Sequence, residues 1–160
     1  MKRSIVFASV LLAMGAAPAI AGPGAPGHSH HMTGFSAGEP GEAGKPARVV
    51  EVTMKEIDGQ MLYLPDRIEL RKGEQIRFVL RNLGGLDHEF VLAITRENLK
   101  HAEEMKKNPD MEHDDPNGRR IAPNKTDDLV WKFTKRGTFE FGCLIPGHRE
   151  AGMVGTVIVK

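Results

Sequence analysis

The segment FGCLIPGHREAGMVG, residues 141–155, contains the only cysteine of the chain. His148 follows Cys143 by five positions and Met153 follows His148 by five, so a thiol, an imidazole and a thioether share one loop. The loop is rich in Pro and Gly and shows neither a helical nor a strand period. Side chains of these three types serve as nucleophiles, as packing residues or as soft metal ligands.

A second imidazole completes a possible ligand set. His88 opens a predicted strand directly after the turn NLGGLD. Two imidazoles, one thiolate and one thioether are the donors of mononuclear type 1 copper, which has a trigonal His₂Cys plane and a weak, long Met bond. We therefore predict one type 1 copper ion bound by His88, Cys143, His148 and Met153.

Three other readings compete with copper. Zinc also binds Cys and His, but Met is a poor ligand for it. A Cys/His nucleophile pair would need a third group to orient the base, and the sequence singles out none. Each residue taken alone also fits a packing or surface role, and the joint placement of all four favours ligands. Because nothing resembles the paired His-x-His runs of multicopper enzymes, we expect a protein that is not an enzyme.

The N-terminal residues predict export. Residues 1–21 (MKRSIVFASVLLAMGAAPAIA) have a basic head, an apolar stretch and an Ala-x-Ala end, which is typical of a cleaved secretory signal peptide and predicts a periplasmic location. A membrane anchor is the alternative, but the apolar run is short and lacks stop-transfer charges. An exported chain usually pairs its cysteines, so an unpaired Cys143 also favours a thiol that a metal occupies.

The remaining chain predicts one all-β domain after a tail. Residues 22–46 are rich in Gly and Pro and predict a disordered tail, and residues 47–160 have the size of one domain. Predicted strands are 48–57, 61–70 with a break at Pro65, 74–82, 88–95, 129–134, 138–143 and 154–160. Residues 96–126 form a polar, partly helical insertion before the last three strands, in which Asn98 is a candidate N-cap and Pro109 ends the helix.

Alternation within the strands predicts which side chains are buried. It is clearest in three sets, Ile76/Phe78/Leu80, Leu129/Trp131/Phe133 and Phe139/Phe141/Cys143. Residues two apart share one face of a strand, so the thiol of Cys143 should point toward the core at the strand end.

The stretch CLIPGHREAGM, with DHEF upstream, resembles the cupredoxins, the small blue copper proteins that include plastocyanin, azurin and rusticyanin. The Cys-x₄-His-x₄-Met spacing is most similar to rusticyanin-like and periplasmic copper-tolerance cupredoxins. The resemblance covers residues 48–160 and implies a Greek-key β-sandwich with the metal near one end. It departs from many members at Glu89, where those members have a small Asn or Ser that braces the ligand loops.

Other His and Met residues predict auxiliary copper binding. HSHHM supplies His28, His30, His31 and Met32 in the tail, and His-rich tracts bind copper or zinc. In the insertion, His101, Met105, Met111 and His113 form a second candidate group, whose alternative is a helix with an apolar stripe of Leu99, Ala102 and Met105.

Two functions follow from a single copper centre. One is copper tolerance or homeostasis, in which the protein sequesters or oxidises periplasmic Cu(I), and the tail favours it. The other is electron shuttling between respiratory redox proteins. The expected partner is a transiently docked redox protein or a copper donor or acceptor. Nearly balanced charge gives no nucleic-acid footprint, and we expect a monomer without stable membrane insertion.

Overall fold

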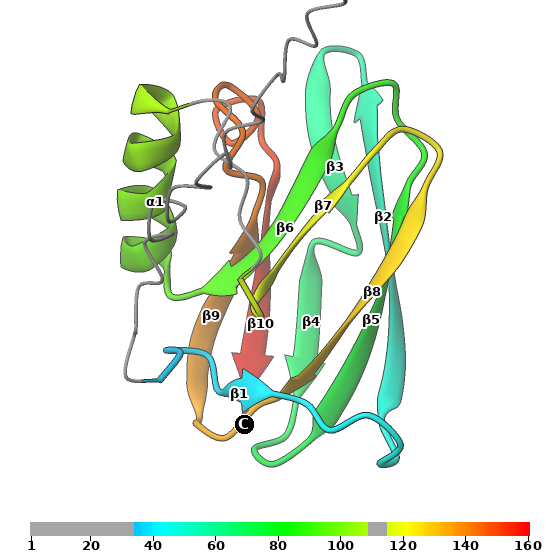
Figure 1. Cartoon of the computed structure of the whole chain (residues 1–160), viewed down its shortest axis with the longest axis vertical. Helices are drawn as coiled ribbons and strands as arrows, with labels where there is room; N and C mark the ends of the chain where they lie inside the picture. Colours follow the sequence, from blue (N-terminus) through cyan, green and yellow to red (C-terminus); the bar gives the residue numbers. More distant parts are fainter. Residues whose placement is uncertain (1–33, 109–114) are drawn as a thin grey trace, which may run out of the picture. The chain divides into compact units, whose positions relative to one another are not determined.

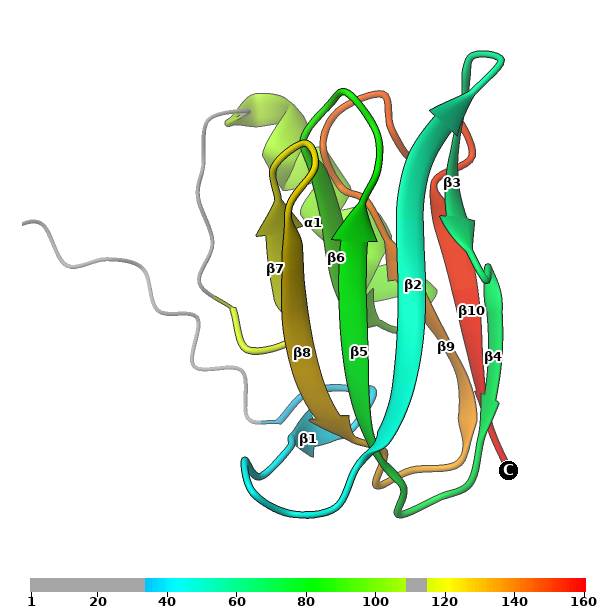
Figure 2. The same ribbon diagram turned by 90° about the vertical axis from the view of Figure 1, so that its right-hand side faces the viewer.

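The computed structural model describes residues 34–108 and 115–160, which belong to one compact unit spanning Met32–Lys160. Two five-stranded sheets face each other in this unit (Figures 1 and 2). The strands are β1 (Glu39–Pro40), β2 (Arg48–Ile57), β3 (Gln60–Leu64), β4 (Arg67–Leu70), β5 (Gln75–Asn82), β6 (His88–Ala93), β7 (Gly118–Ile121), β8 (Thr126–Lys132), β9 (Gly137–Gly142) and β10 (Val154–Val159). The one helix of the described residues is α1 (Thr95–Lys107).

The strand order confirms the predicted β-sandwich. One sheet runs β1-β8-β5-β2-β3 and the other β4-β10-β9-β6-β7. Strands β2 and β5 pair in parallel, as do β10 and β4, and the other pairs are antiparallel. Both sheets are therefore mixed, with connections that cross from one sheet to the other.

Aromatic side chains fill the space between the sheets. Phe78 of β5, Phe90 of β6 and Phe141 of β9 are all 0% exposed, and the rings of Phe90 and Phe141 stack at 4.9 Å. Full burial of one such side chain contributes about 1.5–3 kcal/mol. The buried face of β9 continues to Cys143, which is 0% exposed, so the predicted inward direction of the thiol is confirmed.

The segment between residues 34 and 46 differs from the prediction of a disordered tail. Its strand β1 pairs with β8, and Ala37 is 0% exposed. The indole N–H of Trp131 donates to the carbonyl of Ala37 at 3.3 Å, and the Phe35 ring meets the indole edge to face at 5.2 Å. The segment covers Trp131, so a few specific contacts order a chain whose composition alone predicts disorder. Residues 22–33 lie outside the described residues.

The insertion also contains more regular structure than predicted. Strand β7 pairs with β6 over four residues and forms an edge of its sheet. Helix α1 begins at Thr95 rather than after Asn98, because the Asn98 side chain is buried and binds groups of the sheet instead of capping the helix. The helix ends at Lys107, two residues before Pro109, as the sequence predicts.

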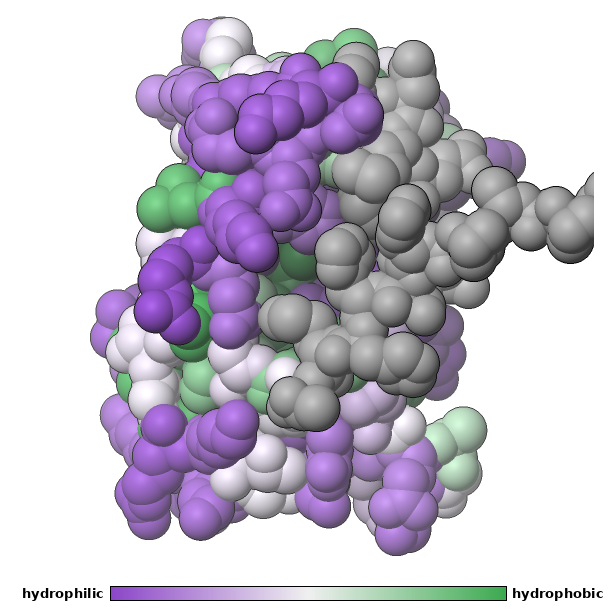
Figure 3. Space-filling model, turned by 60° about the vertical axis from the view of Figure 1, so that its left-hand side comes forward, coloured by the Kyte–Doolittle hydropathy of each residue, from purple (hydrophilic) through white to green (hydrophobic). Residues whose placement is uncertain are grey.

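The prediction of an apolar stripe on the helix is partly wrong. Ala102 and Met105 are buried and pack against Leu144, whereas Leu99 is 48% exposed. Hydrophilic residues predominate among the coloured residues on the α1 side of the molecule (Figure 3). No helix among the described residues is long and apolar enough to cross a membrane.

Candidate metal centre

Strand pairing brings three predicted ligands together from distant parts of the sequence. His88 is the first residue of β6, and Cys143 directly follows β9. These strands are antiparallel neighbours with Val91 opposite Gly142, so the start of β6 lies beside the end of β9. His148 lies in the loop that joins β9 to β10.

The donor atoms of these three residues form a compact triangle. The Nδ1 atom of His148 lies 3.3 Å from the Sγ atom of Cys143 and 3.3 Å from the Nδ1 atom of His88. All three donor atoms lie within 4.8 Å of one another. An ion bound at about 2 Å by three donors in one plane would separate them by about 3.5 Å, so the arrangement fits a trigonal site.

Burial sets the protonation of the three groups. His88 and Cys143 are 0% exposed and His148 is 9% exposed. Burial raises the pKa of the Cys143 thiol to about 12, although N–H donors from Glu89 and Ile145 oppose this by stabilising the thiolate. Burial also lowers the pKa of His88 and His148, so both imidazoles are neutral at pH 7 and can offer a lone pair. A metal that binds here must displace the thiol proton.

Met153 lies at the end of the same loop, just before β10, and is 0% exposed. Its backbone N–H donates to the carbonyl of His148 at 3.1 Å, and its carbonyl accepts from the N–H of Cys143 at 3.2 Å. These bonds tie the backbone of the predicted fourth ligand to the other two loop residues. A thioether added to two imidazoles and a thiolate gives the donor set of type 1 copper.

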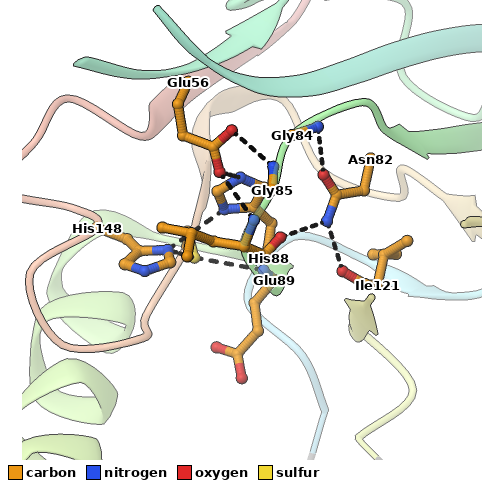
Figure 4. A network of polar contacts seen from close by, with 10 residues as sticks. Glu56, Asn82, Gly84, Gly85, His88, Glu89, Ile121 and His148 are labelled. Carbon is orange, nitrogen blue, oxygen red and sulfur yellow. Dashed lines mark hydrogen bonds and ion pairs between the residues drawn. The ribbon is translucent and has the colours of Figure 1, made fainter. Parts of the chain in front are cut away.

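A carboxylate that the sequence analysis did not single out touches the site. Glu56, near the end of β2, accepts a hydrogen bond from the Nε2 atom of His88 at 3.0 Å (Figure 4). Burial acts to raise the pKa of Glu56, but backbone N–H donors from Gly85 and Leu86 outweigh it and the pKa is lowered. No local pattern marks this residue, because Glu56 reads as a polar position in a strand 32 positions from His88.

Asn82 is the second residue that sequence reasoning missed. It is 0% exposed, and its Nδ2 donates to the carbonyls of Leu86 and Ile121 at 2.7 and 2.8 Å. Its Oδ1 accepts the N–H of Gly84 at 2.9 Å. Asn82 therefore braces the turn before His88 from the inside, whereas the Glu89 carboxylate points away from both imidazoles (Figure 4). The backbone N–H of Glu89 instead donates to the Cys143 sulfur at 3.3 Å.

A largely buried ion pair anchors the loop that carries the remaining ligands. Arg149 donates to both carboxylate oxygens of Glu140 in β9, at 2.5 and 3.0 Å. The Nδ2 atom of Asn98 in α1 donates to the same carboxylate at 3.0 Å. Helix, strand and ligand loop therefore meet at the Glu140 carboxylate. The loop reaches it through Arg149, the residue immediately after His148.

The predicted auxiliary residues are only partly within the described chain. His28, His30, His31, Met32, Met111 and His113 lie outside it. Met105 is buried beneath α1 against Leu144, and His101 lines a separate hollow with Glu89 and Asp115. Among the described residues, His88, Cys143 and His148 form the one group of three His, Cys, Asp or Glu side chains close enough to hold a metal ion. Auxiliary copper binding stays a prediction.

Sequence comparisons agree with copper binding. A family model described as copper-binding proteins of the plastocyanin/azurin family matches residues 50–160. The copper-resistant cuproprotein CopI of Rubrivivax gelatinosus is 50% identical over 123 residues, which cover 77% of this chain and 73% of that protein. The CopI protein of Pseudomonas aeruginosa is 34% identical over 166 residues, which cover 86% and 90%.

Solved structures share the fold at low identity. Auracyanin B matches with a TM-score of 0.62 and 22% identity over 78% of this chain and 96% of its own. A multicopper oxidase from Campylobacter jejuni matches with a TM-score of 0.54 and 16% identity, over 76% of this chain and 31% of its own. The sandwich is thus a cupredoxin fold, its His-Cys-His cluster supports a type 1 copper site, and the chain belongs to the plastocyanin/azurin family of copper-binding proteins.

Proposed function

We propose that this protein acts in the periplasm in copper tolerance, binding one copper ion with His88, Cys143, His148 and Met153. The single observation that carries the proposal is the buried triangle of two Nδ1 atoms and one sulfur. The bound ion would supply one-electron chemistry between Cu(I) and Cu(II). The chain's own residues exclude water, supply the donors and hold them in place in a folded sandwich.

The assignment to tolerance is supported by the CopI relatives, which are described as copper-resistant cuproproteins. Soft donors such as thiolate and thioether favour Cu(I), so the site suits capture of the reduced ion. We further propose that the protein is not an enzyme. The described residues contain one cluster that could hold a metal ion, which is enough for copper binding. Purified protein should therefore turn over neither oxygen nor nitrite.

A visible spectrum of the copper-loaded protein tests the binding site. Cu(II) bound to Cys143 should give intense sulfur-to-copper charge-transfer absorption, and Cys143→Ser should abolish it while leaving the far-UV circular dichroism unchanged. Absorption that persists in Cys143→Ser would refute the assigned ligand set.

Growth in excess copper tests the physiology. A strain that lacks the gene should grow poorly, and the wild-type chain should restore growth while Cys143→Ser should not. Normal growth of the deletion strain would refute the tolerance function and leave the binding site unaffected.

Electron shuttling is the second candidate, and the surface around His148 favours it. Leu83 and Leu86 are 62% and 47% exposed on the turn before His88, and Pro146 is exposed beside His148. A small apolar surface next to a ligand imidazole suits the brief docking of a redox partner. Replacing Leu86 with Asp should slow electron exchange with such a partner without changing copper tolerance if the two functions are separate.

A further inference from the structure

We propose that Glu56 is a positioning residue of the metal centre, which fixes the tautomer of His88 and favours Cu(II) over Cu(I). The second part of this proposal rests on the proposed copper binding, and the first part concerns the metal-free protein as well. Glu56 belongs to β2, in the sheet opposite to β6, so its contact with His88 joins the two sheets at the site.

The hydrogen bond determines which nitrogen of His88 faces the other ligands. An ionised carboxylate can only accept, so the Nε2 atom that lies 3.0 Å from Glu56 must carry the hydrogen. The neutral imidazole then has its lone pair on Nδ1, which lies 3.3 Å from the Nδ1 atom of His148. Glu56 thereby presents the correct nitrogen to an incoming ion before any ion binds.

The carboxylate is itself held in place by the turn that leads to His88. The backbone N–H of Gly85 donates to its Oε2 at 3.0 Å, and that of Leu86 donates to its Oε1 at 3.2 Å. Gly84 leaves room for it, because a Cβ atom there would lie 2.2 Å from Oε2. Figure 4 shows the Glu56 carboxylate in contact with both the Gly85 amide and the His88 ring. One side chain therefore sets the turn and the ligand together.

The negative charge gives Glu56 a second effect. A carboxylate that accepts from the far nitrogen of a ligand histidine raises the basicity of that ligand, and loss of such a partner costs about 10–100-fold in metal affinity. The more highly charged Cu(II) gains more than Cu(I) from a basic ligand and a nearby anion. The Glu56 side chain is 26% exposed, so water screens part of the charge and the hydrogen bond must carry much of the effect.

Asp87 provides a matched control for charge alone. It adjoins His88 in the chain, but its carboxylate pairs with Arg120 at 3.1 Å instead of meeting the imidazole. Glu56→Gln and Asp87→Asn each remove one negative charge near the site. Only the first weakens the hydrogen bond to His88.

The first measurement compares copper affinities and reduction potentials. Glu56→Gln should weaken Cu(II) binding about tenfold or more relative to Cu(I). Each tenfold difference between the two affinities raises the one-electron potential by about 59 mV. Asp87→Asn should shift the potential by much less. A potential in Glu56→Gln equal to that of the wild type, or shifted no more than in Asp87→Asn, would overturn the copper preference assigned to Glu56.

The second measurement needs no copper. Nitrogen-15 chemical shifts of His88 in the metal-free protein should show hydrogen on Nε2 in the wild type and a mixture of tautomers in Glu56→Ala. Hydrogen on Nδ1 in the wild type, or an unchanged tautomer in a folded Glu56→Ala variant, would refute the positioning role. If Glu56→Ala does not fold, Glu56→Gln still tests the proposal, because its amide can donate as well as accept and no longer forces the hydrogen onto Nε2.

The two measurements also separate this proposal from the proposed function. A wild-type protein that shows the expected tautomer but no charge-transfer absorption would refute the copper site and the copper preference assigned to Glu56, leaving its control of the His88 tautomer in place. Normal charge-transfer absorption with an unchanged potential in Glu56→Gln would refute the copper preference alone.

Discussion

At the scale of single residues, the metal centre depends on polar side chains buried around the turn before His88. The side chain of Asn82 is 0% exposed and makes three hydrogen bonds, each to a different backbone group. A buried polar group left without a partner costs about 1–3 kcal/mol. The turn that presents His88 is therefore held by side-chain bonds rather than by a regular element.

Replacing Asn82 with Ala should destabilise the metal-free protein by about 2–3 kcal/mol, because two carbonyl groups and one N–H lose their partner. Urea denaturation of the metal-free chain measures the change. The matched control is Asn117→Ala, since Asn117 uses its side chain for one bond, to the carbonyl of Leu92 at 2.9 Å. Its cost should be nearer 1 kcal/mol. Equal losses in the two variants would show that the bracing of the turn is unimportant.

The sequence predicts the candidate metal ligands better than it predicts the residues that hold those ligands in position. His88, Cys143 and His148 could be found because metal chemistry requires certain residue types at loop and strand ends. Glu56 and Asn82 could not, since Glu and Asn in or after a strand are ordinary solvent-facing residues and their partners are set only by pairing of the two sheets. The one signal was Glu89, which stands where the resemblance leads us to expect a small Asn or Ser. Its presence indicated that another residue must hold the turn.

At the scale of elements, Glu140 joins strand β9, helix α1 and the ligand loop. Its side chain is 7% exposed and that of its partner Arg149 is 17% exposed. Burial alone would raise the pKa of Glu140, but the bonds from Arg149 and Asn98 outweigh burial and lower it. A carboxyl whose pKa is lower in the folded than in the unfolded chain stabilises the fold when it is ionised in both.

Replacing Glu140 with Gln should therefore destabilise the protein by about 3 kcal/mol at neutral pH, because Arg149 keeps a largely buried charge without its partner. The stabilisation from Glu140 is present above the normal Glu pKa of 4.5 and is lost as the pH falls through its lower folded value. The stability difference between wild type and Glu140→Gln should thus shrink in acid. Urea denaturation over a series of pH values measures it.

Glu69→Gln is the control for this pH dependence. Glu69 also pairs with basic residues, Arg67 and Lys160, but its side chain is 46% exposed and water screens the pairs. Its replacement should change stability little at any pH. A Glu140→Gln variant as stable as Glu69→Gln would exclude an important role for the buried pair.

Strand β1 gives a second test at the scale of elements. Gly38 has a φ of +138°, and a Cβ atom there would lie 2.2 Å from the carbonyl oxygen of Lys132 in β8. Gly38→Ala should detach β1 and cost about 1–3 kcal/mol. Trp131 is the only tryptophan and is 0% exposed under this segment, so its fluorescence should shift to longer wavelength.

Gly44→Ala is the matched control for Gly38→Ala. Gly44 also has a positive φ, of +84°, but a Cβ atom there meets nothing within 4 Å. Gly44→Ala therefore has the conformational cost of a side chain at positive φ, but its Cβ atom collides with no other atom. A Trp131 emission that is equally unchanged in both variants would show that Gly38→Ala does not detach the segment that covers the indole.

The elements predicted well are those whose burial follows a simple period. The range 48–57 coincides with β2, and Ile76, Phe78 and Leu80 of β5 alternate as predicted and are all 0% exposed. β1 and β7 were missed because they are short edge strands, in which pairing partners rather than alternating apolar residues determine the structure. In GRRI of β7, one residue of four is buried, which gives no recognisable strand period.

At the scale of the whole molecule, the N-terminal histidines and the ligands of the metal centre lie far apart in the sequence. The unit Met32–Lys160 contains the cluster of His88, Cys143 and His148, whereas His28, His30 and His31 lie outside the described residues. Copper tolerance by sequestration would benefit from additional sites, whereas electron transfer needs one. The number of ions bound per chain therefore distinguishes the two roles.

Deleting residues 22–33 from the exported chain should lower the number of bound copper ions from more than one to one, because His-rich tracts bind copper. The deletion should stop at residue 33, since Phe35 and Ala37 contact Trp131 and belong to the sandwich. The charge-transfer spectrum should not change. Elemental analysis after dialysis against a competing chelator measures the stoichiometry, and replacement of His28, His30 and His31 with Ala in the full chain is the control. One ion per chain in every form would argue against sequestration by the tail and leave the single copper centre to account for tolerance.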